Sequence, residues 1–132
     1  MCNSLTKSFY YKGNPETDKK LVRIYNPLSS DLASMRQTLL FGGLESVLHN
    51  ANRKNLNLRM YEFGNIYLRL DKNTGDPLDE YFEEERLALF ITGLKNEANW
   101  NTPAEKSNFF QLKAYTEMVL RKLGFDLDQI RK

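Results

Sequence analysis

The stretch LRMYEFGNIYLRL, residues 58–70, has the composition of a β-strand and places one carboxylate, Glu62, among aromatic and aliphatic neighbours. Tyrosine, phenylalanine and isoleucine favour extended backbone. Successive side chains of a strand point to opposite faces, so Glu62 shares a mostly apolar face with Met60 and Leu68, whereas Arg69 lies on the other face. The stretch therefore predicts a strand and raises the question of what a carboxylate does on its apolar side.

Glu62 has two physical explanations. Either the carboxylate is buried and paired with a cation, for instance Arg36, or its face opens into a groove. We favour the paired, structural role, because no serine or cysteine nucleophile stands at a telling spacing. The only histidine, His49, lies on a predicted helix between Leu48 and Asn50. We expect it to be structural or at the surface rather than catalytic.

The residues after this strand predict a long hairpin. Residues 71–85 are acidic and turn-forming, and RLALFITGL (86–94) is nearly all apolar, as expected of a central strand covered on both faces. We place the tip of the hairpin near residues 73–77 and a loop at residues 95–107.

The residues before this strand predict an amphipathic helix. Ser29, Ser30 and Asp31 are good N-cap residues, and apolar residues then recur on one helix face. Gly42 and Gly43 cost about 1 kcal/mol each against alanine in a helix, and indicate an irregular first turn or a close backbone approach. The apolar face consists of Leu40, Leu44, Val47, Leu48 and Ala51.

The two ends of the chain complete a β-β-α-β-β-α order. Residues 3–11 and 20–27 predict two strands, joined as a hairpin through the loop-forming residues 12–19. A second helix over residues 108–123 starts with the capping-box pair Asn108 and Gln111 and ends before a glycine, as in a Schellman motif. The sequence therefore predicts an α+β fold with a largely antiparallel sheet.

Composition indicates an ordinary globular protein. The chain has 132 residues, of which 41% are hydrophobic and 27% charged, enough for one domain. No apolar run approaches the roughly 18 residues of a membrane span, and no signal-peptide pattern begins the chain. The single cysteine, Cys2, allows no intrachain disulfide or cysteine-cluster metal site, and a reducing, cytoplasmic setting is expected.

The charge is unevenly distributed. The net charge is +2, but residues 1–70 carry +5 and residues 71–132 carry −3. The acidic run over residues 79–85 lacks the spacing of a cation site, and we interpret it as solvated. No glycine-rich phosphate loop occurs. On the residues alone, the chain is a soluble α+β domain and not an enzyme.

Several stretches, taken in order, resemble the C-terminal part of the β subunit of bacterial phenylalanyl-tRNA synthetase, over nearly the whole chain. Asn108 and Ala114 depart from the aspartate and glycine expected there, and both changes are mild. The stretches are NSLT (3–6), NPLSSDLASMRQTLLFGGLESVLHNANR (26–53), YEFGNIY (61–67), ALFITG (88–93), ANW (98–100) and NFFQLKAYTEMVLRKLGF (108–125).

The resemblance implies the antiparallel-sheet fold of class II synthetase catalytic domains, present in part over residues 1–132 as one catalytically inactive fragment. It further implies packing against the α subunit in an (αβ)₂ assembly, in which α uses ATP to activate phenylalanine and charges tRNA(Phe). ATP and Mg²⁺ would serve the whole complex, with no cofactor, metal or membrane contact in this fragment. Residue 1 falls at the start of a strand and nothing after Gly124 resembles the last class II motif, so we expect an incomplete domain.

The resemblance also bears on the opening strand. In active relatives this strand ends in an arginine that binds the ATP α-phosphate, with a glutamate two residues later. Leu68 and Leu70 occupy these positions here, and Arg69 cannot substitute because its side chain lies on the opposite face. The alternative is an ATP-binding adenylating domain fragment related to class II synthetases, and Leu68 speaks against it.

The same stretches supply candidates for structural and interface roles. We expect Arg36 and Glu62 to be structural, and the apolar surface around Phe41, together with the outer face of the 108–123 helix, to meet a partner. Glycines in the first turn would let a partner's backbone come close. The full set of candidates is Arg36, Phe41, Gly42, Gly43, Leu44, Asn50, Arg53 and Glu62.

Overall fold

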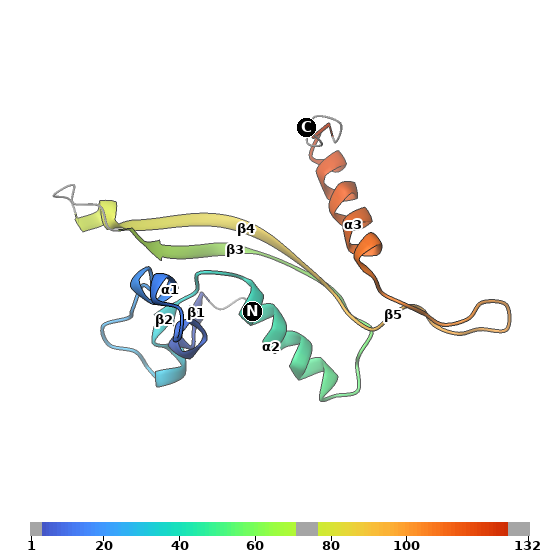
Figure 1. The fold of residues 1–132 in the computed structure, drawn as a ribbon, viewed down its shortest axis with the longest axis horizontal. Coiled ribbons are helices and arrows are strands. Elements are labelled where there is room, and N and C mark those ends of the chain that lie inside the picture. Colours follow the sequence, from blue (N-terminus) through green and yellow to red (C-terminus); the bar gives the residue numbers. More distant parts are fainter. Residues whose placement is uncertain (1–3, 71–76, 127–132) are drawn as a thin grey trace. The chain divides into compact units, whose positions relative to one another are not determined.

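The computed structural model of the chain describes residues 4–70 and 77–126. The chain divides into two compact units, the first formed by residues 1–46 and 62–88 and the second by residues 47–61 and 89–132. Helices and antiparallel strands make up both units, so the α+β composition predicted from the sequence is observed (Figure 1).

The N-terminal strands pair differently from the prediction. β1 (Leu5–Thr6) pairs antiparallel with β2 (Ser34–Met35). Residues 20–27 contain no strand, and Arg23 forms an isolated antiparallel bridge with Ser34. The predicted hairpin between residues 3–11 and 20–27 is therefore wrong, because β2 lies between the two segments.

The second half of the predicted first strand is a 3-10 helix (Ser8–Tyr11). In a strand, Tyr10 and Tyr11 would point to opposite faces. The helical turn instead brings both rings onto Phe41, with ring centroids 4.5 and 5.5 Å away. Aromatic packing thus overrides the β-propensity of this segment.

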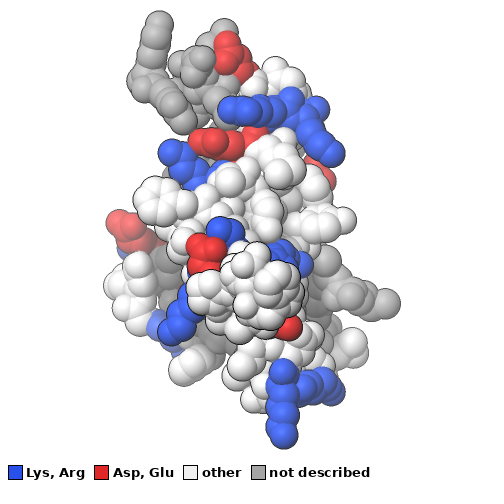
Figure 2. Space-filling model, turned by 90° about the vertical axis from the view of Figure 1, so that its right-hand side faces the viewer, with Lys and Arg blue, Asp and Glu red and all other residues white. Residues whose placement is uncertain are grey.

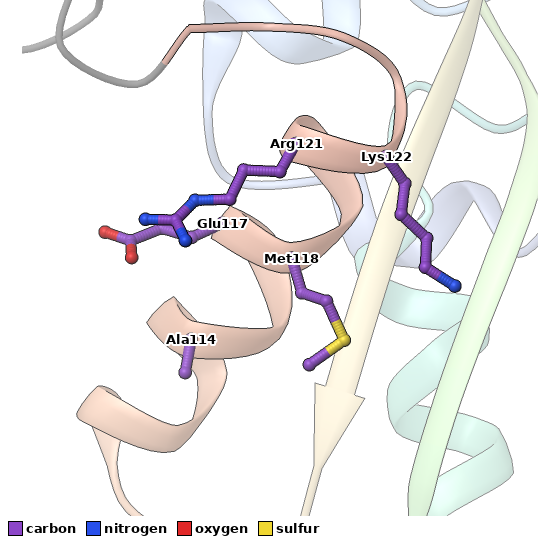
Figure 3. A pocket seen from close by; sticks show the side chains of 5 residues that line it. All are labelled: Ala114, Glu117, Met118, Arg121 and Lys122. Carbon is purple, nitrogen blue, oxygen red and sulfur yellow. The ribbon is translucent and has the colours of Figure 1, made fainter.

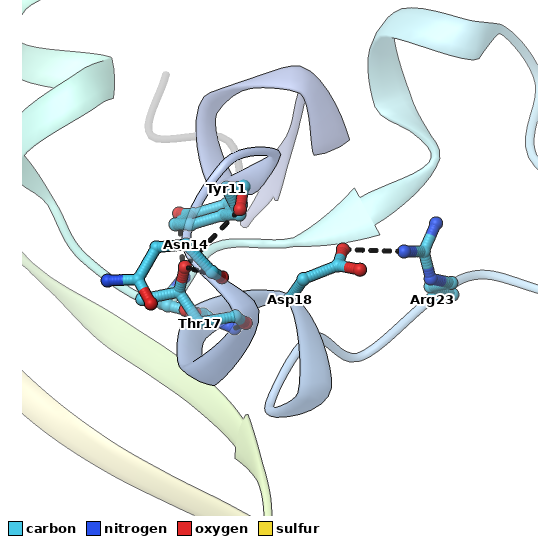
Figure 4. A network of polar contacts seen from close by, with 6 residues as sticks. Tyr11, Asn14, Thr17, Asp18 and Arg23 are labelled. Atoms are coloured by element: carbon cyan, nitrogen blue, oxygen red, sulfur yellow. Dashed lines mark hydrogen bonds and ion pairs between the residues drawn. The ribbon is translucent and has the colours of Figure 1, made fainter.

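The predicted loop 12–19 contains the short helix α1 (Pro15–Lys19). The Asn14 side chain accepts a hydrogen bond from a first-turn N–H at 3.0 Å, and the proline stands at the first helical position. The Thr17 hydroxyl donates to two carbonyls that precede the helix, and Asp18 pairs with Arg23 at 2.7 Å (Figure 4). These local contacts tie α1 to the segments on either side of it.

The predicted long hairpin is present. β3 (Arg59–Arg69) and β4 (Tyr81–Ile91) form a two-stranded sheet and run in opposite directions (Figure 1). β4 begins earlier than predicted, after a 3-10 helix (Pro77–Glu80). The expectation of a central strand covered on both faces is wrong for the described residues, which supply no third strand, and Leu87 is 37% exposed.

Helix α2 (Leu40–Ala51) starts later than the predicted caps at residues 29–31. Residues 30–32 form a 3-10 helix and β2 follows it. The Thr38 hydroxyl oxygen accepts a hydrogen bond from the Leu40 N–H at 3.2 Å, where the helix begins. The first turn is regular, because Gly43 N donates to the Leu39 carbonyl at 3.1 Å.

The predicted loop 95–107 contains a small hairpin of β5 (Leu94–Asn96) and β6 (Glu105–Lys106), paired antiparallel with a register shift. Strands this short carry no periodicity that a sequence could reveal. Gly93, with φ +75°, precedes the hairpin, and a Cβ there would lie 2.5 Å from the Leu56 carbonyl oxygen. Only glycine fits this turn without strain.

Helix α3 (Phe109–Lys122) begins and ends where the sequence predicted. The Asn108 side chain accepts from the Gln111 N–H at 3.0 Å. Gly124 has φ +85°, and the N–H groups of Gly124 and Phe125 donate, at 3.0 Å each, to the carbonyls of Arg121 and Leu120. These two bonds define a complete Schellman motif.

Well-buried side chains of the described residues gather in the first unit. Its buried hydrophobic residues come from the N-terminal segments, the residue before α2 and the middle of β3, whereas the second unit contributes Leu58 alone. Much apolar surface on α3 therefore stays exposed. The buried hydrophobic residues of the first unit are Tyr11, Leu21, Leu39 and Ile66.

Candidate functional site

Arg36 and Glu62 form an ion pair within the first unit, as predicted. Arg36 directly follows β2 and is fixed by its backbone, which accepts from the Tyr67 N–H at 2.9 Å and donates to the Ser4 carbonyl at 3.0 Å. The guanidinium contacts the Glu62 carboxylate, and Nε donates to the Asn65 carbonyl at 2.9 Å. The two side chains are 7% and 15% exposed, so solvent has little access to the pair.

Gly64 makes room for this pair. A Cβ built at Gly64 would lie 2.0 Å from Nη2 of Arg36. The guanidinium is held on two sides, by Glu62 and by the Asn65 carbonyl, so it cannot swing away at low cost. This role of Gly64 was not predicted from the sequence, although Gly64 stands two residues from Glu62 on the same strand face.

Within the described residues, the other ionisable candidates make contacts at the surface. His49 is exposed and contacts the Arg53 side chain. Of the predicted solvated acidic run, Glu80 pairs with Arg69 at 3.1 Å. Within residues 4–70 and 77–126, no three His, Cys, Asp or Glu side chains converge where a metal ion could bind. Cys2 lies outside the described residues.

At the end of β3, Leu68 and Arg69 lie on opposite faces of the strand, as assumed in the expectation that this strand does not bind ATP. Leu68 is half-buried on the side of Glu62, whereas Arg69 is exposed. The Arg69 side chain pairs with Glu80, and the Arg69 backbone N–H donates to the Lys20 carbonyl at 2.8 Å. The basic group is thus engaged on the face opposite Leu68.

An aromatic and charged cluster surrounds the start of α2. Phe41 stacks on Tyr10, whose hydroxyl donates to the Glu45 carboxylate, and Lys7 Nζ lies 3.3 Å from the same carboxylate. The hydrogen bond from Tyr10 lowers the pKa of Glu45, and hydrogen bonding to Glu45 raises the pKa of Tyr10 and of Lys7. Burial raises the pKa of Tyr11. Phe41 therefore packs against Tyr10 and Tyr11 and is only partly exposed.

The leucines of α2 lie at the surface, whereas Val47 and Ala51 are half-buried. Leu40 and Leu44, one turn apart, are each 49% exposed, and Leu48 one turn further on is more exposed still. Gly43 is buried, whereas a Cβ built at Gly42 would meet nothing within 4 Å. The sequence pattern of an amphipathic helix is present, and the described residues cover its apolar face only in part, leaving the three leucines about half exposed or more.

The C-terminal end of α2 holds Asn50 and Arg53 in local contacts. The Asn50 carbonyl accepts from the N–H groups of Arg53 and Asn55, at 2.9 and 3.0 Å. The Arg53 guanidinium contacts the His49 ring and donates to its carbonyl at 3.3 Å. Both candidates thus terminate the helix, where a cation also suits the helix dipole.

A shallow hollow of about 460 Å³ lies on α3 and was not predicted. Its lining comes from one helix face, and Figure 3 shows the Glu117 and Arg121 side chains side by side, with Met118 on the adjacent turn. A hollow lined by one helix lacks the converging groups of an active site. The lining residues are Ala114, Glu117, Met118, Arg121 and Lys122.

Charged side chains are dispersed. On the face shown in Figure 2, lysine and arginine occur in small separate groups with acidic and uncharged residues between them. Several basic side chains of the described residues are paired with carboxylates, including Arg23 with Asp18 and Lys95 with Glu105.

Comparisons with known proteins identify the family. The family model described as "Phenylalanyl tRNA synthetase beta chain CLM domain" matches residues 1–131. The chain belongs to this family. It is 49% identical over 131 residues to the phenylalanine–tRNA ligase β subunit of Bacteroides thetaiotaomicron, covering 97% of the chain and 16% of that protein. It is 42% identical over 127 residues to that of Porphyromonas gingivalis, covering 94% and 16%.

Membership of the β chain CLM family confirms the resemblance to the phenylalanyl-tRNA synthetase β subunit. The chain corresponds to a part of such a β subunit and spans 16% of the length of these relatives. None of the helices in residues 4–70 and 77–126 combines the length and hydrophobicity of a membrane span. Two features of the candidate residues need a functional explanation in a member of this family. They are the buried Arg36–Glu62 ion pair and the exposed leucines of α2.

Proposed function

We propose that the chain is the C-terminal, catalytic-like region of a phenylalanine–tRNA ligase β subunit, and that it is a non-catalytic module that helps hold β against the α subunit. The resemblance of residues 26–53 and 61–67 supports this placement within the β subunit. In this proposal the β3–β4 hairpin is part of a class II synthetase-like antiparallel sheet, and the helices flank that sheet. The antiparallel pairing of β3 with β4 is consistent with that fold.

The whole complex would supply the chemistry. We expect an (αβ)₂ enzyme in the cytoplasm that makes Phe-tRNA(Phe) from ATP, phenylalanine and tRNA, with Mg²⁺ bound alongside ATP. In this chain the half-buried Leu68 provides no donor for a phosphate, and Arg69 is engaged with Glu80 on the other face. These residues support a scaffold rather than a nucleotide site.

The observation that carries the proposal is the uncovered apolar face of α2. Three leucines at helical spacing, Leu40, Leu44 and Leu48, are each about half exposed or more. Removing apolar side chains from water is worth roughly 25 cal/mol per Å², so such a face gains stability when a partner covers it. Gly42 lies on the opposite side of the helix from these leucines, so the open space there does not belong to this face.

Co-purification with the α subunit tests the proposal. Leu44→Asp places a charge on the face and should abolish or strongly weaken capture of α by the tagged β subunit. Leu28→Asp is the matched control, because Leu28 is 98% exposed and lies outside α2. Phe41→Asp is a poorer probe, since Phe41 packs on Tyr10 and its loss would also disturb the fold.

The outcomes separate the alternatives. Capture lost with Leu44→Asp but kept with Leu28→Asp would support α2 as the interface. If the Leu44→Asp subunit assembles with α and the complex aminoacylates tRNA at the wild-type rate, α2 is not the interface. Unfolding curves of both variants show whether a lost interaction reflects a lost fold.

A further inference from the structure

The turn that ends α2 places a lysine where helices most often place a glycine (Figure 1). The Lys54 N–H donates to the Ala51 carbonyl at 2.9 Å, and the Asn55 N–H donates to the Asn50 carbonyl at 3.0 Å. These two bonds form a Schellman motif, in which the residue after the C-cap adopts left-handed backbone. Among residues 4–70 and 77–126, Lys54 is the one residue other than glycine with a positive φ, at +63°.

The end of α3 has the same motif, but there the left-handed residue is Gly124, with φ +85°. Glycine adopts this backbone freely, whereas the β-carbon of a lysine crowds the carbonyl oxygen that follows it. The helix dipole favours a cation at the end of α2, but Arg53 already supplies one. Lysine at position 54 is therefore unfavourable for the fold, and strained backbone of this kind points to a function for the side chain.

The sequence around Lys54 is basic. Residues 47–61 contain Arg53, Lys54 and Arg59 and no Asp or Glu. The second unit as a whole holds ten Lys or Arg and five Asp or Glu, a charge of +5, whereas the first unit holds nine and twelve, a charge of −3. Lys54 is exposed, and none of the ion pairs between described residues includes it. Its ammonium group is therefore available to an anion that approaches the second unit.

A nucleic-acid backbone matches this turn better than a protein surface does. Asn52 and Asn55 flank the two cations, and asparagine joins lysine and arginine among the side chains that bind phosphates and sugars. The Glu97 carboxylate accepts from the Asn57 amide at 3.1 Å, so it is directed to another side chain than Lys54. A protein that buried Lys54 would have to supply a counter-charge, whereas RNA carries one at every nucleotide.

We propose that the turn at residues 52–55 binds the phosphate backbone of tRNA, with Lys54 and Arg53 as the cationic contacts. The inference rests on the proposed function, because tRNA is the polyanion that the complex would bind, and it adds an RNA contact separate from the leucines of α2. The Arg53 guanidinium is held by the His49 ring and carbonyl, so little freedom is lost on binding. Phosphate contacts position a nucleic acid without reading its sequence.

The test measures binding of fluorescently labelled tRNA(Phe) to the chain by anisotropy over a series of KCl concentrations. Lys54→Gly should weaken binding about threefold to tenfold and lower the slope of log K against log [KCl] by about one, because one phosphate contact is lost. The same variant should raise the urea midpoint of the chain, since glycine relieves the left-handed backbone. Lys54→Arg keeps the charge and should bind tRNA like wild type.

Lys113→Ala is the matched control, because it removes one positive charge from the same unit, where Lys113 lies 3.8 Å from the Glu117 carboxylate. It should change tRNA affinity less than about twofold. An equal loss of affinity in Lys113→Ala and Lys54→Gly would assign binding to overall charge and overturn the inference. Wild-type affinity and salt slope in Lys54→Gly, or no tRNA binding by the wild-type chain, would overturn it as well.

Capture of the α subunit separates this inference from the proposed function. Lys54→Gly should be captured by α like wild type. If this variant loses α but keeps tRNA, the turn belongs to a protein interface and the inference is wrong, although the proposed function stands. If the wild-type chain binds tRNA with the expected salt dependence and is not captured by α, the RNA contact stands and the proposed function is wrong.

Discussion

Glu62→Ala should destabilise the chain by about 3–5 kcal/mol, because it leaves the Arg36 guanidinium buried without its counter-ion. The size of this loss in stability follows from the burial of the Arg36 side chain. Arg36 is 7% exposed, so water cannot replace the lost carboxylate, and the Asn65 carbonyl at 2.9 Å remains as a neutral acceptor. A backbone carbonyl offers a hydrogen bond but no opposite charge.

Two further variants check this reasoning. The double replacement Arg36→Met with Glu62→Leu removes both charges and keeps the volume, and should cost far less than Glu62→Ala alone. Glu84→Ala is the surface control. Its carboxylate pairs with Arg86 at 2.7 Å, but both side chains are about half exposed, so the loss should stay below about 1 kcal/mol.

Urea unfolding followed by circular dichroism gives the free energies, compared at unchanged m-value. A change within about 0.5 kcal/mol for Glu62→Ala, the range of ordinary surface substitutions, would refute the buried pair. A double variant less stable than Glu62→Ala would refute the claim that the unpaired charge is what costs stability.

Three other outcomes follow from the geometry. Gly64→Ala should destabilise the chain by about 1–3 kcal/mol by displacing Arg36, whereas Gly42→Ala, in open space on a helix, should stabilise it by up to about 1 kcal/mol; urea unfolding that ranks them the other way would contradict the crowding at Gly64. The hydrogen bond from Tyr10 lowers the folded-state pKa of Glu45 below its ordinary value of 4.5. The contribution of the Glu45 carboxylate to folding stability is therefore present above pH 4.5 and is lost as pH falls through the lowered pKa. The unfolding free energies of wild type and Glu45→Gln should therefore differ by less than about 1 kcal/mol at pH 7 and converge as pH falls through the lowered pKa of Glu45, and a gap that widens on acidification would oppose this assignment. Calorimetry should show no saturable ATP binding at millimolar concentrations, and a one-to-one isotherm of micromolar affinity would restore the adenylating alternative.

Elements with their own local signals were predictable from the sequence. β3 follows from its alternation, and α3 from Asn108 at its start and Gly124 at its end, because caps and glycine turns act within a few residues. The Arg36–Glu62 pair was also accessible, since a lone carboxylate on an apolar face requires a cation.

Elements decided by distant contacts were not predictable. Residues 8–11 have β-propensity, yet packing on Phe41 turns them into a 3-10 helix. β2 is two residues long and draws its partners from residues 5–6 and 23, so no periodicity marks it. The role of Gly64 likewise depends on an arginine 28 positions earlier in the chain, a distance no local pattern spans.

The closeness of Gly64 to Arg36 has an evolutionary consequence. A side chain at position 64 crowds the buried guanidinium of Arg36, with 2.0 Å between the Cβ and Nη2, so a change at this position alone costs stability. Within the family, side chains at position 64 should arise only in lineages whose position 36 has already become smaller or uncharged, and arginine at 36 should return only where 64 is glycine. Sterics thus favour one order of substitution, in which position 36 changes before position 64.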